Sequence, residues 1–233
     1  MGFPGGLGGV TSSQLPDLSP VILVPLGSTE QHGPHLPLDT DTRIAVAVAR
    51  AAGARLAAPV APAVSYGASG EHQSFPGTIS IGTEALTRLL IEYGRSASCW
   101  TRRLVFVNGH GGNVAALRSA VKLLRFEGRD VAWYPCAVAD ADAHAGHTET
   151  SLLLYLSPKD VCVERLRAGN RAPLAELMPS IRRGGVAAVS EIGVLGDPTT
   201  ATAAAGELLF GDLVAGCVGT VRAWAPDGGG MLR

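Results

Sequence analysis

Carboxylates and imidazoles are concentrated in one short stretch, STEQHGPHLPLDTD, at residues 28–41. A divalent transition metal binds such imidazole nitrogens and carboxylate oxygens at about 2.0–2.2 Å. In an extended segment side chains alternate, so that residues two apart face the same side. The stretch is therefore either a solvated connection or one wall of a cation site. Its candidate ligands are Glu30, His32, His35, Asp39 and Asp41.

Two later segments supply more groups of the same kind. His110 lies in NGHGGN, and DAHAGHTET contains His144, His147 and Glu149. The chain has six histidines, and the remaining one, His72, lies in GEHQSFPGT. Mixed nitrogen and oxygen ligation suits Fe²⁺ and Zn²⁺ alike, and availability decides between them. We therefore expect a metal site assembled from segments far apart in the sequence.

Some of these residues have a plain structural alternative. Asp41 could cap the helix that begins near Thr42. Asp39 could orient a ligating imidazole, as carboxylates behind a metal ligand do. The roles of His35, His72 and Asp39 stay open, and His147 is expected to be a bystander.

Strand and helix patterns alternate along the chain, which predicts an α/β fold with a mainly parallel sheet covered on both faces. Loops at the carboxyl ends of parallel strands gather along one edge, and ligands bind there. The loops 28–41, 108–113 and 137–149 follow predicted strands, so we expect them to meet. The predicted strands are 21–27, 55–64, 103–109 and 130–136, and the predicted helices are 42–53, 83–100, 113–128, 148–157 and 207–224.

Composition narrows the class of protein. The chain has 233 residues, 46% apolar and 17% charged, which favours a single well-buried domain at 21–233 behind a flexible arm at 1–20. Lys and Arg number 19 against 20 Asp and Glu, so no basic field for nucleic acid or membrane is expected. We see neither a signal peptide nor an apolar run approaching the ~20 residues of a membrane span. Four scattered cysteines indicate reduced thiols, hence a cytoplasmic protein.

NGHGGN permits another interpretation, a dinucleotide-binding turn of an oxidoreductase between a strand and a helix. Against it, Val114 stands where a third small residue is needed, and the bulky His110 stands where pyrophosphate would approach. A further alternative is a non-catalytic binding module in which a metal only joins the three loops.

Four segments together resemble the creatininase family of metal-dependent amidohydrolases: GSTEQHGPHLPLDTD, EHQSFPGTISIGTEAL, FVNGHGGN and HAGHTETS. The resemblance runs from about residue 20 to 157, and GVLGDPTTATAAAGE at 193–207 looks like the family's C-terminal part. It implies a three-layer α/β/α fold, two divalent metal ions and hydrolysis of an amide bond. The ions would be Fe²⁺, Zn²⁺ or both, with Mn²⁺ as a third option.

The resemblance also implies a ligand set. Glu30, Asp41 and His110 would hold one metal; His32, the bridging Asp41 and a further carboxylate would hold the other. In creatininase itself that carboxylate lies two residues after the histidine, and here that position is Gly112. Creatinine is therefore not the expected substrate.

We predict that Glu149 fills the vacancy as a ligand, although a role as general base stays open. His144 matches the proton-transfer histidine of the family. Within the family, the resemblance is strongest to a member acting on a modified ribosomal precursor peptide, from which a dipeptide derived from C-terminal Val–Tyr would be released. The alternative is a formamide or cyclic-amide hydrolase of another cofactor pathway. Relatives form rings of subunits, which implies a homo-oligomer.

Overall fold

The computed structural model describes residues 6–17 and 21–233. Three parallel strands form its sheet in the order β1-β2-β3. They are β1 (Val21–Leu26), β2 (Arg103–Asn108) and β3 (Asp130–Pro135). The strands are in register from their first residues, since Val21 pairs with Arg103 and Arg103 with Asp130. Their carboxyl ends therefore finish level, at one edge of the sheet.

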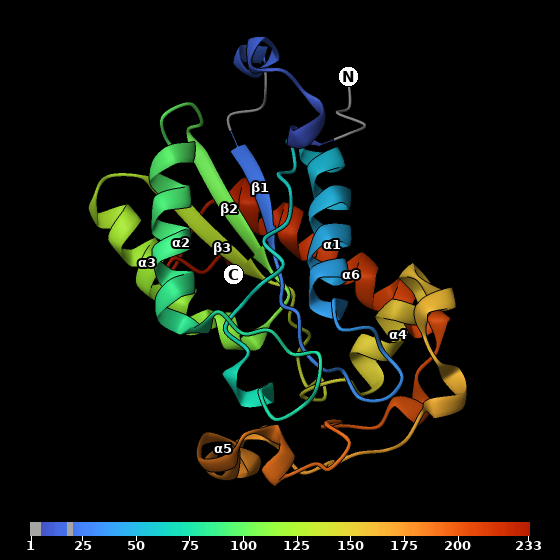
Figure 1. Cartoon of the computed structure of the whole chain (residues 1–233). Helices are drawn as coiled ribbons and strands as arrows, with labels where there is room; N and C mark the ends of the chain where they lie inside the picture. The colour runs from blue at the N-terminus through green and yellow to red at the C-terminus, as the bar shows by residue number, and fades with distance from the viewer. Residues whose placement is uncertain (1–5, 18–20) are drawn as a thin grey trace.

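Alternation of apolar side chains along the strands builds two cores, one on each face. Leu23 and Val105 point into the core formed with α1, α4 and α6, whereas Ile22 and Leu104 point into the core formed with α2 and α3. Figure 1 shows the sheet between these two helical layers, so the predicted three-layer α/β/α fold is confirmed. The helices are α1 (Thr40–Leu56), α2 (Gly82–Ala97), α3 (Val114–Phe126), α4 (His147–Leu156) and α6 (Ala203–Ala223).

One helix was not predicted from the sequence. Helix α5 (Leu174–Gly184) contains Pro179 and follows Pro173, and these prolines obscure its helical pattern. It buries Leu177 and Ile181 in a small separate core. In Figure 1 this helix lies at the bottom, beyond the end of the sheet where the strands finish.

The prediction of a regular strand at 55–64 is wrong. Helix α1 continues through Leu56, and the following segment makes only isolated parallel bridges to β1, at Val60 and Val64. This segment still forms backbone hydrogen bonds with β1: the Ala61 N–H donates to the Leu23 carbonyl at 2.9 Å. Pro59 and Pro62 have no N–H to donate, and this prevents a continuous ladder.

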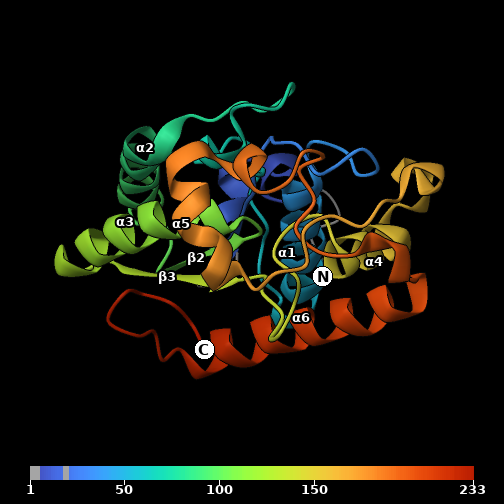
Figure 2. The same ribbon diagram turned by 90° about the horizontal axis from the view of Figure 1, so that it is seen from below.

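The expectation that no apolar segment reaches membrane length also needs correction. Helix α6, with 21 residues, is long and apolar enough to cross a membrane by length and composition alone. In the fold it packs along α4 and α1 (Figure 2) and buries Leu213, Val214 and Cys217 against the sheet. Tyr134 of β3 donates its hydroxyl to the Leu213 carbonyl at 3.0 Å, which ties α6 to the sheet.

Part of the predicted N-terminal arm lies outside the described residues, namely 1–5 and 18–20. Within the described part, Leu7–Gly9 and Ser12–Asp17 form short 3-10 helices. Leu7 N–H donates to the Val60 carbonyl at 2.7 Å. The division into an arm at 1–20 and one domain at 21–233 stays a proposal.

Candidate metal centre

Glycines at the strand ends let α1 dock against the loops of the site. A side chain at Gly109 would place its Cβ 2.3 Å from the Asp41 carbonyl oxygen, and one at Gly27 would meet Thr42 at 2.3 Å. Residues without a Cβ are therefore needed where β1 and β2 end. This close approach brings the first turn of α1, and Asp41 with it, over the edge of the sheet.

Asp41 joins two histidines from different loops. Its Oδ1 lies 3.2 Å from His32 Nε2 and its Oδ2 lies 3.2 Å from His110 Nδ1. Ser28 also donates its hydroxyl to Asp41 Oδ2 at 2.7 Å. The side chain is buried and faces inward, while Asp39 occupies the N-cap position of α1. The helix-cap alternative for Asp41 is therefore wrong, and its two oxygens face histidines from two different loops.

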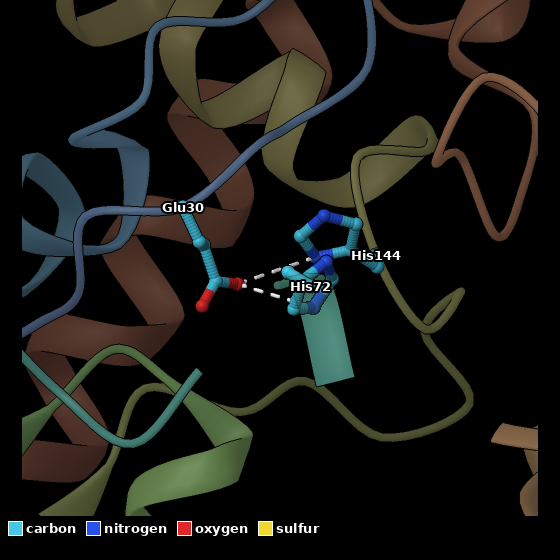
Figure 3. Close-up of side chains that lie close together, drawn as sticks. All are labelled: Glu30, His72 and His144. Carbon is cyan, nitrogen blue, oxygen red and sulfur yellow. Dashed lines mark ion pairs between the residues drawn. The ribbon is translucent and has the colours of Figure 1, made fainter. Parts of the chain in front are cut away.

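Glu30 is buried beside three imidazoles. Its Oε2 lies 3.2 Å from His110 Nε2, and its Oε1 lies 3.4 Å from His72 Nε2 and 3.8 Å from His144 Nδ1. Figure 3 shows His72 and His144 on the same side of the Glu30 carboxylate. Among the described residues, both Glu30 oxygens are left without a hydrogen-bond partner. Burying a carboxylate without hydrogen bonds costs free energy, and a bound cation would offset that cost.

A second group lies on the other side of Asp41. His32 Nε2 is 3.8 Å from Glu149 Oε2, and the His32 and His144 rings have centroids 4.3 Å apart. His32 Nδ1 lies 3.2 Å from the Glu30 carbonyl, an acceptor that directs Nε2 towards the carboxylates. Ala145 N–H donates to Glu149 Oε2 at 2.6 Å. We name Glu30, Asp41 and His110 the inner cluster, and His32, His144 and Glu149 the outer cluster; each set can place its ligand atoms around one ion.

Charges in the site shift the pKa values in opposing directions. Burial lowers the pKa of His32 and His110, but the neighbouring carboxylates outweigh it and raise both to about 10. Burial raises the pKa of Glu30 and of Glu149 to about 7. Burial also lowers the pKa of His72, to about 3. The metal-free site therefore holds protons where a cation would otherwise balance the carboxylates.

The structure brings together all of the predicted site residues, which are Glu30, His32, Asp41, His110, His144 and Glu149. It also adds His72, whose role the sequence left open. His147 lies apart and bonds through Nδ1 to the Thr200 hydroxyl at 2.9 Å, in keeping with a bystander. The sequence leaves the role of Asp39 open; its side chain accepts from Arg43 at 2.7 Å and is half exposed, which contradicts the alternative that it orients an imidazole.

Sequence reasoning missed one further carboxylate. Glu71 Oε1 lies 3.6 Å from His110 Nε2, and a Cβ at Gly112 would come within 2.7 Å of that oxygen and 2.3 Å of the Ala68 carbonyl. Position 112 thus has no room for a side chain, and Glu71 approaches His110 from there. The sequence feature that could have pointed to Glu71 is its position next to His72 in GEHQSFPGT.

Asn113 and His35 support the loops from outside the two clusters. Asn113, at the start of α3, donates to the Gly27 carbonyl at 2.9 Å and accepts from Ala68 N–H at 2.9 Å. His35 is buried, and its Nε2 lies 2.9 Å from the Thr150 hydroxyl on α4. The placement of His110 among carboxylates contradicts the dinucleotide-turn interpretation of NGHGGN, because the ring fills the space above the turn.

A cavity of about 740 Å³ opens beside the outer cluster. Glu149, Gly109 and Gly111 line it next to the site, and Ile44, Leu152 and Leu195 supply apolar wall. Arg171 and Asp197 line it as an ion pair. Within the described residues, a molecule in this cavity therefore meets Glu149 directly, whereas Glu30 is fully buried.

The three layers place a group of carboxylates and imidazoles at the carboxyl edge of the sheet, a donor set suited to metal-assisted hydrolysis. A family model described as creatininase, creatinine amidohydrolase, matches residues 10–221. This chain belongs to the creatininase family.

Relatives give the finer comparison. The mycofactocin precursor peptide peptidase of Mycolicibacterium smegmatis is 66% identical over 236 residues, covering 99% of this chain and 96% of that protein. The protein of the same name from Mycobacterium tuberculosis is 68% identical over 238 residues, covering 98% and 95%. The creatinine amidohydrolase of Pseudomonas putida is 32% identical over 176 residues, covering 63% and 68%.

Solved structures agree on the fold. A crystal structure of creatinine amidohydrolase (creatininase) has a TM-score of 0.77 at 27% identity and covers 94% of this chain and 98% of that chain. A structure titled "Creatininase Mn" has a TM-score of 0.77 at 27% identity and covers 93% and 97%.

Proposed function

We propose that this protein is a metal-dependent peptidase that cleaves the mycofactocin precursor peptide and releases the modified dipeptide derived from its C-terminal Val–Tyr. The carrying observation is the bridging geometry of Asp41, with His32 and His110 each 3.2 Å from one of its oxygens. The names of relatives at 66% and 68% identity support the substrate.

The residues present fit two divalent ions. Glu30, Asp41 and His110 would hold one, and His32, Asp41 and Glu149 the other. The orphaned oxygens of Glu30 and the nitrogen–oxygen donor set suit Zn²⁺, Fe²⁺ or Mn²⁺. When bound, such ions supply Lewis-acid polarisation of an amide carbonyl and lower the pKa of an attacking water.

The chain's own residues would complete the reaction. His144 directs Nδ1 towards Glu30 and lies beside His32, so this nitrogen can accept a proton from water and pass it to the departing amine. The apolar wall of the cavity would hold the residues next to the scissile bond. Glu149, at the border between cavity and site, would act as a ligand rather than as the general base.

The defining experiment offers modified precursor peptide, unmodified precursor, a formamide and a cyclic amide to enzyme loaded separately with Zn²⁺, Fe²⁺ or Mn²⁺. We expect release of the modified dipeptide, detected by mass spectrometry, and loss of release with a chelator. Turnover of the formamide or cyclic amide alone would replace the peptidase proposal with the alternative. Tight metal binding without turnover of any substrate would favour the binding-module alternative.

His144 has its own test. His144→Ala should retain both ions but lose most turnover, with the metal content measured by elemental analysis. Loss of one ion from this variant would make His144 a ligand instead, which its place in the outer cluster permits.

Three broader expectations accompany the proposal: a cytoplasmic location, a homo-oligomeric assembly, and no nucleic-acid or membrane partner. The near balance of 19 basic and 20 acidic residues supports the absence of a polyanionic partner. Sedimentation analysis tests the assembly. Cell fractionation tests the location, and detergent-free recovery from the soluble fraction tests whether α6 stays within the fold.

A further inference from the structure

Gln31 stands between two histidines of the site, and all three side chains are buried. Its Nε2 lies 2.8 Å from His72 Nδ1 and 3.1 Å from the Gly193 carbonyl. Its Oε1 accepts from Gly33 N–H at 2.8 Å. The proposed mechanism gives Gln31 no role.

Two backbone groups settle which way the Gln31 amide points. The Gly33 N–H can only donate, so the atom facing it must be the amide oxygen. The Gly193 carbonyl can only accept, so the atom facing it must be the amide nitrogen. Gly193 has φ +78, and a Cβ there would lie 2.0 Å from Gln31 Oε1, so a glycine is needed for the amide to fit.

This orientation determines the proton position on His72. The amide nitrogen has only protons to offer, so His72 Nδ1 must accept. A neutral imidazole that accepts at Nδ1 carries its proton on Nε2. That nitrogen lies 3.4 Å from Glu30 Oε1 without forming a hydrogen bond to it, so the side of His72 that faces the carboxylate carries an N–H and has no lone pair for a metal. Glu30, His72 and His144 are close enough to surround an ion, but this tautomer removes His72 as a ligand.

His144 meets Glu30 with the opposite nitrogen. Its Nε2 lies 2.8 Å from the Gln31 backbone carbonyl, which can only accept, so Nε2 carries the proton. The side-chain nitrogen of Gln31, 3.1 Å away, has its two protons directed to His72 and Gly193. His144 Nδ1 is then a lone pair facing Glu30 Oε1 at 3.8 Å. Two acceptors facing one another need a cation or a proton between them.

We propose that Gln31 is a positioning residue that makes two adjacent histidines present opposite nitrogens to Glu30. Its side-chain amide turns the Nε2–H of His72 towards the carboxylate, and its backbone carbonyl keeps the Nδ1 lone pair of His144 directed at the centre. The consequence for catalysis rests on the proposed function, whereas the tautomers themselves do not.

The test uses metal-free protein with isotope-labelled histidine and long-range proton–nitrogen spectra, which distinguish the two tautomers. In the unaltered chain we expect both rings to carry the proton on Nε2. Gln31→Glu replaces the donor facing His72 with an acceptor, so His72 Nδ1 should become protonated. His144 should keep its tautomer, because a backbone carbonyl sets it, and it serves as an internal reference.

The exposed neighbour Gln73→Glu makes the same chemical change one residue from His72 and should leave both spectra unchanged. Gln31→Met, which has no donor or acceptor to face His72, should leave that ring as a mixture of tautomers and covers the case in which Gln31→Glu does not fold. A proton on His72 Nδ1 in the unaltered chain would overturn the proposal. So would a His72 signal that neither substitution at position 31 changes.

Metal titration of the same samples measures the consequence for the site. We expect Gln31→Glu to weaken binding by ~10–100-fold, as loss of a partner behind a metal ligand does. On the peptide substrate, kcat should fall with KM nearly unchanged. If the spectra show the expected tautomers but the enzyme does not cleave the peptide, the proposed substrate is wrong and the proposed role of Gln31 still holds.

Discussion

Asp41 of the inner cluster contacts His32 of the outer cluster, but the two clusters differ in their access to solvent. In the inner cluster Glu30 and Asp41 have side-chain exposures of 0% and 2%, and loops after β1 and β2 enclose them. In the outer cluster Glu149, on the first turn of α4, has 22% exposure and borders the cavity. The difference indicates a division of labour: the inner cluster would anchor an ion, and the outer cluster would face the substrate.

Removing the charge of Asp41, which contacts a histidine of each cluster, should have the largest effect. Asp41→Asn keeps the shape but loses the charge between His32 and His110, so we expect loss of both ions and a fall in kcat/KM well beyond ~100-fold, which is the upper range for groups that only support a ligand. Elemental analysis and peptide turnover measure the two effects. Asp212→Asn, exposed on α6, is the control and should retain both. Retention of one full equivalent of metal in Asp41→Asn would show that the bridge is dispensable.

Glu149→Gln tests whether the two clusters bind their ions independently. We expect the inner ion to remain and the outer ion to dissociate, with turnover reduced by ~100-fold or more. Two-site metal titration gives the stoichiometry, and Glu207→Gln on exposed α6 surface provides the matched control. If both ions leave together, the two clusters behave as one cooperative unit and the proposed division of labour fails.

Metal removal should reverse the pH dependence of stability. Glu30 and Glu149 have pKa values raised from 4.5 to about 7, so metal-free protein loses their contribution as pH rises across that range. His32 and His110 have pKa values raised from 6.5 to about 10, so their contribution is present below pH 6.5 and is lost as pH rises towards 10. Both pairs therefore favour low pH.

Metal binding displaces these protons and so strengthens with pH. We expect chelated protein to have a Tm several degrees higher at pH 5.5 than at pH 9, since ~1 kcal/mol corresponds to roughly 2–4 °C for a chain of this size. The gain in Tm on adding Zn²⁺ should increase over the same range. A Tm of chelated protein that rises with pH would contradict the proton-filled site.

The smallest effect is expected at Glu71, the carboxylate beside the inner cluster. Its side chain is 31% exposed and 3.6 Å from His110, so Glu71→Gln should weaken the inner ion by no more than ~10-fold. Isothermal titration against Glu191→Gln, an exposed control, resolves this difference. A loss as large as that of Asp41→Asn would place Glu71 among the ligands.

The sequence by itself determined the layered α/β architecture, because apolar strands and helices alternate and such patterns leave little choice of topology. It also named the residues that converge, from Glu30 to Glu149, since each follows a strand that must end at the same edge. It did not predict α5, whose prolines hide its period, and it predicted a strand at 55–64 that prolines 59 and 62 interrupt.

Only the tertiary structure decided which groups face one another. His72 and Glu71 lie on a short turn with no strand to aim them, so no local pattern could place them beside Glu30 and His110. The sequence shows that position 112 has no carboxylate. Only the structure explains why: a Cβ at Gly112 would lie 2.3 Å from the Ala68 carbonyl oxygen, so no side chain fits there. The physical reason is that a side chain's partners depend on contacts across the fold, whereas periodicity and spacing report only its local backbone.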